Sequence, residues 1–179
     1  MIDHINKWYN VGMKTILAIY AALFTSISFA WSYRSTPSAT SKHPNISFTL
    51  ISSPKEVGFV NNHLALLIYM PETSLDEKGR FLTTPSLLVD TMKDTMHPSK
   101  VGRFLIQIDK QKPIQVQAEP TAVKTLWKIP KSMSLIAKLK TASTLTISFE
   151  SLINGVTQYT FSAEGLAVRY EQAKADLKR

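Results

Sequence analysis

The chain of 179 residues contains no cysteine. This absence excludes a disulfide framework, a lipoprotein anchor, a thiolate zinc site, an iron–sulfur cluster and a cysteine nucleophile. Glycine is scarce, and its six residues stand apart from one another, so the sequence has no glycine-rich phosphate loop. Only one segment is long and apolar enough to enter a bilayer, which excludes a polytopic membrane protein. Because 44% of the residues are apolar, the chain can still form a core, and wholesale disorder is excluded.

The one long apolar run, residues 15–31, reads TILAIYAALFTSISFAW and carries no charge. Lys14 precedes it, and Ser28 and Ala30 supply the small residues of a cleavage site after Ala30. A positive start, an apolar stretch and a small-x-small end are typical of a secretory signal. The alternative is an uncleaved anchor, because the run is about long enough to span roughly 30 Å of hydrocarbon. The first interpretation predicts a periplasmic or secreted protein, and the second an inner-membrane anchor facing the periplasm.

The chain divides into three predicted parts. Residues 1–30 are the signal peptide or anchor, and the true start is left open between Met1 and Met13. Residues 31–45 are rich in Ser, Thr and Pro and are predicted to be a flexible leader. Residues 46–179 are predicted to form a single β-rich exported domain.

Two-residue alternation of apolar and polar residues dominates after residue 45. It predicts strands at 46–50, 63–70, 101–108, 114–117 and 144–149. Helical spacing predicts a short helix within 131–140 and another within 85–97. The C-terminal segment is predicted to be a helix that Ser162 caps, with Glu164 in its first turn. The predicted fold is therefore mainly β, an antiparallel sheet or β-sandwich with one short helix and a C-terminal helix, preceded by an N-terminal signal or anchor helix.

The Asn154-Gly155 pair is the strongest hairpin signal in the chain. A two-residue turn there would place Phe149 and Phe161 on opposite faces of the sheet, which is unfavourable when one face is buried. We therefore expect a three-residue loop with Gly155 at positive φ, or an equivalent bulge, which would pair Phe149 with Phe161.

Few residues suggest catalysis. The histidines of the exported part, His43, His63 and His97, are far apart and match no metal-ligand motif. Asp90 and Asp94 could share a face near His97, but a solvated face explains them better, so we expect no catalytic residue, no metal and no cofactor.

The formal net charge is +8. We expect no nucleic-acid partner for an exported protein, so the charge suggests an anionic envelope surface or an acidic protein partner, or serves solubility alone. A membrane contact is expected only through residues 15–31, if these are not cleaved. The candidate binding surface combines basic residues with an aromatic one: Lys124, Trp127, Lys128, Lys131, Lys138 and Lys140. The alternative is that Trp127 belongs to the core and the lysines solvate the surface.

The C-terminal half contains FLIQID, LWKIP, SLIAKLKTASTLTISFE and NGVTQYTFSAEGLAVRYEQA in this order. Over roughly residues 101–175 this pattern resembles small exported proteins associated with type VI secretion and is similar to the tail of invasion-associated locus B proteins. The elements that carry the resemblance are Ile108, Asp109, Trp127, Leu139, Phe161, Gly165 and Leu166. Both families usually carry cysteines, and this chain has none.

The resemblance implies a non-catalytic envelope protein that serves secretion or host contact, and it transfers no catalytic residue. The leading hypothesis is a non-enzymatic exported accessory or binding protein of an envelope or secretion assembly. The alternative is an inner-membrane-anchored structural subunit of a secretion or conjugation apparatus. An envelope hydrolase has no supporting motif.

Overall fold

The computed structural model describes residues 30–179 except 54, 58–59, 93–95, 97–101 and 153. The described strands are β1 (Trp31–Thr36), β2 (Asn45–Ile51), β3 (Lys55–Val57), β4 (Val60–Asn62), β5 (Ala65–Met70), β6 (Ser86–Asp90), β7 (Gly102–Ile108), β8 (Ile114–Pro120), β9 (Leu126–Ile129), β10 (Thr144–Ser151) and β11 (Gly155–Ser162). The described helices are α2 (Met133–Leu139) and α3 (Leu166–Leu177). The residues predicted to form a signal or anchor helix, 1–29, lie outside the described residues.

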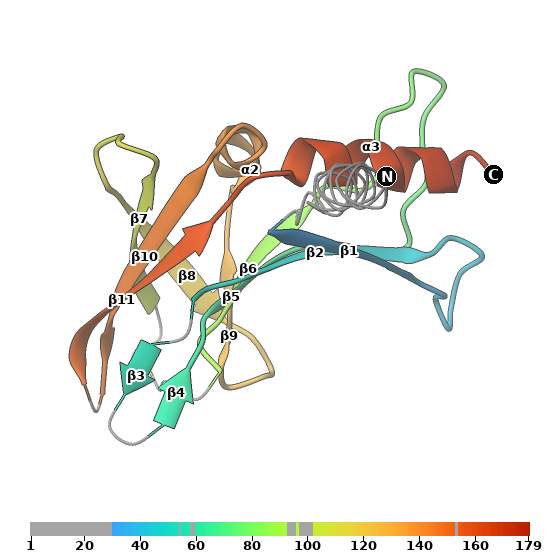
Figure 1. Cartoon of the computed structure of the whole chain (residues 1–179). Coiled ribbons are helices and arrows are strands. Elements are labelled where there is room, and N and C mark those ends of the chain that lie inside the picture. Colours follow the sequence, from blue (N-terminus) through green and yellow to red (C-terminus); the bar gives the residue numbers. More distant parts are fainter. Residues whose placement is uncertain (1–29, 54, 58–59, 93–95, 97–101, 153) are drawn as a thin grey trace, which may run out of the picture.

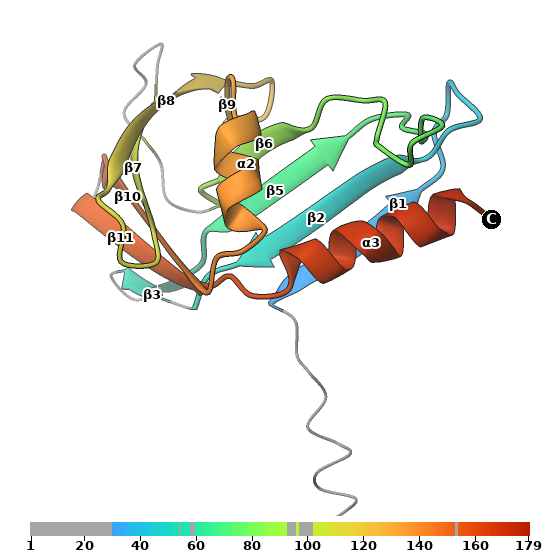
Figure 2. The ribbon, with the colours of Figure 1, turned by 90° about the horizontal axis from the view of Figure 1, so that it is seen from above.

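Nine strands form one hydrogen-bonded sheet in the order β1-β2-β5-β6-β9-β8-β7-β10-β11, and β3 pairs with β4 separately. Every pair of neighbours in the large sheet is antiparallel. The sheet twists strongly, so that β10 and β11 run steeply while β1 and β2 run nearly level (Figure 1). Helices α2 and α3 both lie over one face of it (Figure 2). The predicted antiparallel β fold with a short helix and a C-terminal helix is thus confirmed.

The core lies between the helices and the face of the sheet that they cover. Strand β2 shows why, because its inward residues Ile46, Phe48 and Leu50 are fully buried while the residues between them are partly exposed. Helix α3 closes the core over this strand, and the ring of its Tyr170 stacks on Phe48 with centroids 4.5 Å apart. Helix α2 buries Leu135, Ile136 and Leu139, which confirms the short helix predicted within 131–140.

The β10–β11 hairpin confirms part of the predicted register. Ser151 pairs with Gly155, so three residues lie between the strands, and Gly155 has a φ of 63°. Phe149 and Phe161 lie on the same buried face, as expected. The predicted pairing of these two rings is wrong, because the loop begins earlier in the chain and Phe149 pairs with Thr157.

Residues 31–36 are not a flexible leader, which corrects the sequence prediction. They form the edge strand β1, which pairs with β2 along its whole length. Trp31 has an exposed fraction of 0%, and its indole N–H donates a hydrogen bond of 2.8 Å to the carbonyl of Ala163. The prediction failed because β1 is mostly polar, as an edge strand can be, and a single tryptophan provides most of its buried surface.

Two helical predictions are also wrong. Residues 86–90, expected within a helix, form β6, where Leu87 and Val89 are buried. This strand lies between β5 and β9, where backbone pairing on both sides outweighs the helical spacing of its leucines. Ser162 does not cap α3 but ends β11, and the N-cap of α3 is Gly165, whose φ is 95°.

Candidate functional site

The structure divides the predicted basic surface between different parts of the molecule. Lys124 lies in the turn between β8 and β9, Lys128 lies on β9, Lys131 lies in the turn before α2, and Lys138 and Lys140 lie at the end of α2. All five lysines are exposed, whereas Trp127 has an exposed fraction of only 5%. Trp127 is therefore a core residue, as the alternative interpretation expects.

Strand geometry separates Lys128 from the lysines of α2. Successive side chains of a strand point to opposite faces, and the neighbours of Lys128, Trp127 and Ile129, are both buried. Ile129 belongs to a row of paired buried residues that crosses β6 and β5 and ends at Phe48, beneath α3. Lys128 therefore lies on the face of the sheet opposite the helices, next to Glu119 of β8.

Lys140 lies on the wall of a hollow of about 510 Å³ between α2, α3 and the segment that joins β5 to β6. Apolar side chains from all three elements line this hollow, and cations stand among them. The lining residues are Met70, Asp76, Arg80, Phe81, Leu82, Thr83, Thr84, Pro85, Met133, Ile136, Ala137, Lys140, Tyr170 and Lys174. The hollow is the candidate binding site, and Lys140 alone connects it to the predicted surface.

The ammonium of Lys140 lies 4.0 Å from the centroid of the Tyr170 ring. Burial lowers the pKa of Lys140, and the nearby charge of Lys174 lowers this pKa further, while Glu171 offsets part of the effect. Among the residues that the structure describes, no carboxylate forms a salt bridge with Lys140. The side chain thus presents a partly desolvated positive charge to the hollow.

The other cations of the hollow have partners. The guanidinium of Arg80 forms a salt bridge of 2.8 Å with Asp76, and the ammonium of Lys174 forms one of 2.8 Å with Glu171 on α3. Each of these two cations therefore has a carboxylate partner within the protein. Lys140 differs from them in having an aromatic ring as its neighbour instead of a carboxylate.

Tyr170 forms the floor of the hollow. Its ring lies between Phe48 and Phe81, and Phe81 meets it edge-on with centroids 5.7 Å apart. Burial raises the pKa of its phenol, and its hydroxyl has no hydrogen-bond partner among the described residues. A ring packed in this way is a rigid surface for the ammonium of Lys140.

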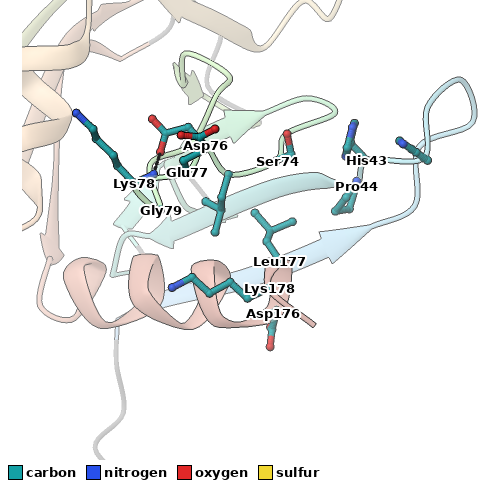
Figure 3. Close-up of a pocket in the computed structure, with 12 residues that line it drawn as sticks. His43, Pro44, Ser74, Asp76, Glu77, Lys78, Gly79, Asp176, Leu177 and Lys178 are labelled. Atoms are coloured by element: carbon teal, nitrogen blue, oxygen red, sulfur yellow. Dashed lines mark hydrogen bonds between the residues drawn. The ribbon is translucent and has the colours of Figure 1, made fainter.

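A second hollow, of about 710 Å³, lies on the other side of the 74–80 turn (Figure 3). Its side chains come from the 42–44 loop, the 74–79 turn and the end of α3. Charges of both signs are mixed there, and the carboxylate of Asp76 is already held by Arg80 and by the backbone N–H of Lys78. We regard this hollow as a solvated cleft between loops.

The residues tested for catalysis do not assemble in the described part of the chain. No group of three His, Asp or Glu that could hold a metal is found there. His63 bonds through its ring to the carbonyl of Ser52, and Asp90 accepts a hydrogen bond from the backbone N–H of Met92. Asp94 and His97 lie outside the described residues. Among the described helices, none is both long and apolar enough to cross a membrane.

Comparison with solved structures finds a similar fold. No protein-family model matches the chain, and neither does any curated protein. The crystal structure of invasion associated protein B from Bartonella henselae is similar, with a TM-score of 0.52 and 12% sequence identity. The similarity covers 84% of this chain and 95% of that one. At this identity the likeness is one of fold, and it supports the resemblance to invasion-associated locus B proteins at that level, while the resemblance to type VI secretion proteins stays a prediction.

Sequence reasoning missed most of the hollow. Phe81 and Leu82 directly follow the charged segment 71–80 and belong to no predicted strand or helix, and Tyr170 lies in the predicted C-terminal helix with no binding role assigned to it. The available signal was the pair of apolar residues directly after Arg80, which a purely solvated turn does not need.

Proposed function

We propose that this chain is an exported, non-enzymatic binding protein that serves as an accessory component of a bacterial envelope assembly. The observation that carries the proposal is the hollow between α2 and α3, where the unpaired ammonium of Lys140 stands among apolar side chains. Such a combination suits recognition of another molecule, because apolar contacts supply affinity and one charged group fixes orientation.

Two further observations support the proposal. The fold is that of a bacterial protein whose name associates it with invasion. The apolar run at residues 15–31 has the features of an export signal. Under this proposal the partner is a protein of the envelope or of a secretion assembly. If the run is retained, the same domain is an inner-membrane-anchored subunit that faces the periplasm.

Fractionation and crosslinking in bacterial cells test the proposal. A photo-crosslinking amino acid is placed at Leu82, which is 64% exposed at the rim of the hollow, and as a control at Val156, which is 78% exposed on the edge strand β11. We expect the chain in the periplasmic or membrane fraction, with a crosslinked envelope protein, identified by mass spectrometry, from Leu82 and not from Val156. A chain confined to the cytosol, or equal crosslinking from both positions, contradicts the proposal.

N-terminal sequencing of the purified protein then distinguishes the two forms of the proposal, a cleaved export signal and a retained anchor. A sequence that begins at Trp31 indicates a cleaved signal. A retained run of residues 15–31 indicates an anchor.

A further inference from the structure

Two large apolar side chains are exposed on the lining of the hollow between α2 and α3. Leu82 is 64% exposed and Met133 is 54% exposed, and both line the hollow together with the partly buried Phe81. They come from different elements, since Leu82 precedes β6 and Met133 begins α2. Large apolar side chains brought together from two elements around an opening are typical of a contact site for a partner.

The charges on the wall of the hollow favour an anion. Arg80, Lys140 and Lys174 are cationic and only Asp76 is anionic among the lining residues. Internal salt bridges engage Arg80 and Lys174, so Lys140 is the described cation of the hollow that is left to meet a charge from outside. A carboxylate next to this ammonium would gain from the partly desolvated surroundings that now disfavour the lysine's own charge.

The shape of the site favours a peptide segment over a lipid. Sites for small apolar ligands bury most of the ligand, whereas the apolar rim here stays more than half exposed. A free acyl chain would keep much of its surface in water. A protruding side chain of a partner protein would instead be covered on one side by the hollow and on the other by its own protein.

We propose that the hollow binds an acidic, apolar peptide segment of a partner protein, with a carboxylate on the ammonium of Lys140 and an apolar side chain between Leu82 and Met133. The inference rests on the proposed function and gives that function a chemical class of partner. Lys140 is the residue that orients the segment, and the Tyr170 ring holds its ammonium in place.

A library of short fluorescein-labelled peptides tests this proposal with the purified exported domain. The peptides vary leucine, phenylalanine, glutamate and aspartate among neutral positions, and binding is read by fluorescence anisotropy. We expect peptides that combine acidic and apolar residues to bind, and replacement of their acidic residues by the neutral amides to abolish binding. Absence of any acidic binder overturns the proposal.

Matched variants then locate the site. Lys140→Gln is expected to weaken the best peptide about tenfold, because it removes a charge-assisted contact. Lys138→Gln is the control, since it makes the same change of charge on the same helix but does not line the hollow. Leu82→Ser is expected to weaken binding to a similar extent, and Val168→Ser, at an exposed residue of α3 outside the hollow, to leave it unchanged. Equal losses from Lys140→Gln and Lys138→Gln refute the assignment, because nonspecific attraction to a basic protein would produce them.

A stability measurement distinguishes a lost contact from a damaged fold. The folded protein lowers the pKa of Lys140, which means that it disfavours the charged form at neutral pH. Lys140→Met keeps the long apolar stem and removes the charge, so its thermal midpoint is expected to equal or exceed that of the wild type while peptide binding falls. A fall in the midpoint that accompanies the loss of binding contradicts a binding role for this ammonium.

Two outcomes separate this inference from the proposed function. The first uses decanoate as a fatty-acid probe. If decanoate binds in a Lys140-dependent way and no peptide binds, the hollow takes a lipid and the inference is wrong. Lys140-dependent peptide binding together with a chain confined to the cytosol would retain the chemistry of the hollow and reject the envelope function.

Discussion

The indole of Trp31 connects the first and last parts of the domain at the scale of a single residue. The indole N–H donates to the carbonyl of Ala163, just before α3, and the backbone carbonyl of Trp31 accepts a hydrogen bond of 2.9 Å from the guanidinium of Arg169 on that helix. The ring itself is fully buried. One residue thus connects the edge strand β1, through its side chain and its backbone, to α3 and to the residue just before it.

Trp31→Phe should destabilise the protein by about 1–3 kcal/mol, because it leaves the buried carbonyl of Ala163 without its donor. Trp31→Ala should cost about 3–5 kcal/mol, since it also opens a cavity. Urea unfolding measures both free energies. An unfolding free energy of Trp31→Phe equal to that of the wild type would show that water replaces the indole at this carbonyl.

Asp109 makes a second connection, between the end of β7 and the start of β10. The backbone N–H groups of Thr144 and Ser143 donate to its carboxylate at 2.8 and 2.9 Å, and these hydrogen bonds hold the pKa of Asp109 below its usual range. Because the pKa of Asp109 is lower in the folded chain than in the unfolded one, its carboxylate stabilises the fold at pH values above the unfolded pKa, about 3.9. This contribution is lost as the pH falls through the folded pKa.

Asp109→Asn tests this pH dependence. Asparagine tolerates the left-handed backbone at this position, where φ is 51°, so the variant changes mainly the charge. We expect a thermal midpoint below that of the wild type at neutral pH, and a difference that vanishes as the solution is acidified. The carboxylates of Glu72 and Asp76, whose pKa values are also lowered, are present in both proteins and cancel in the comparison. A difference that persists undiminished in acid would refute the role of the charge.

At the scale of elements, sequence periodicity predicts a strand or helix correctly when only one face of that element is buried in the core. It succeeds for β2, β7 and β10, whose alternating residues face the core on one side only. It fails for β6, because leucines on both faces of a central strand imitate helical spacing. It fails for β1, because the partners of Trp31 lie far away in the sequence at Leu50 and Ala163.

Gly102 shows a constraint between elements that periodicity does not reveal. A Cβ atom at this start of β7 would lie 2.8 Å from Cε3 of Trp127 and 3.3 Å from Cε of Met96. Because Trp127 is buried, its ring has little room to move, so Gly102→Ala should destabilise by about 1–3 kcal/mol. Urea unfolding measures the effect. The same substitution in a Trp127→Leu background should cost less, and an equal cost in both backgrounds would refute the steric explanation.

At the scale of the whole molecule, the candidate site could be predicted only in part. Composition indicates an excess of lysine, but the topology decides which lysines share a surface. It places Lys128 on the open face of the sheet and Lys140 on the helix side, against the ring of Tyr170 from a different helix. The hollow depends on three elements that meet only after the sheet has formed, so no local pattern contains it.

The same topology makes β1 an integral part of the sheet, and truncation tests this. A chain that starts at Trp31 retains β1, whereas one that starts at Pro37 loses the whole strand, the Trp31–Ala163 hydrogen bond and the stacking of Tyr33 on Phe48. Burial of one tryptophan contributes about 3–5 kcal/mol, against roughly 5–15 kcal/mol for the stability of a whole domain. We therefore expect the chain from Pro37 to melt at least about 10 °C below the chain from Trp31, as measured by circular dichroism. Equal thermal midpoints for the two chains would mean that residues 31–36 are, after all, a dispensable leader.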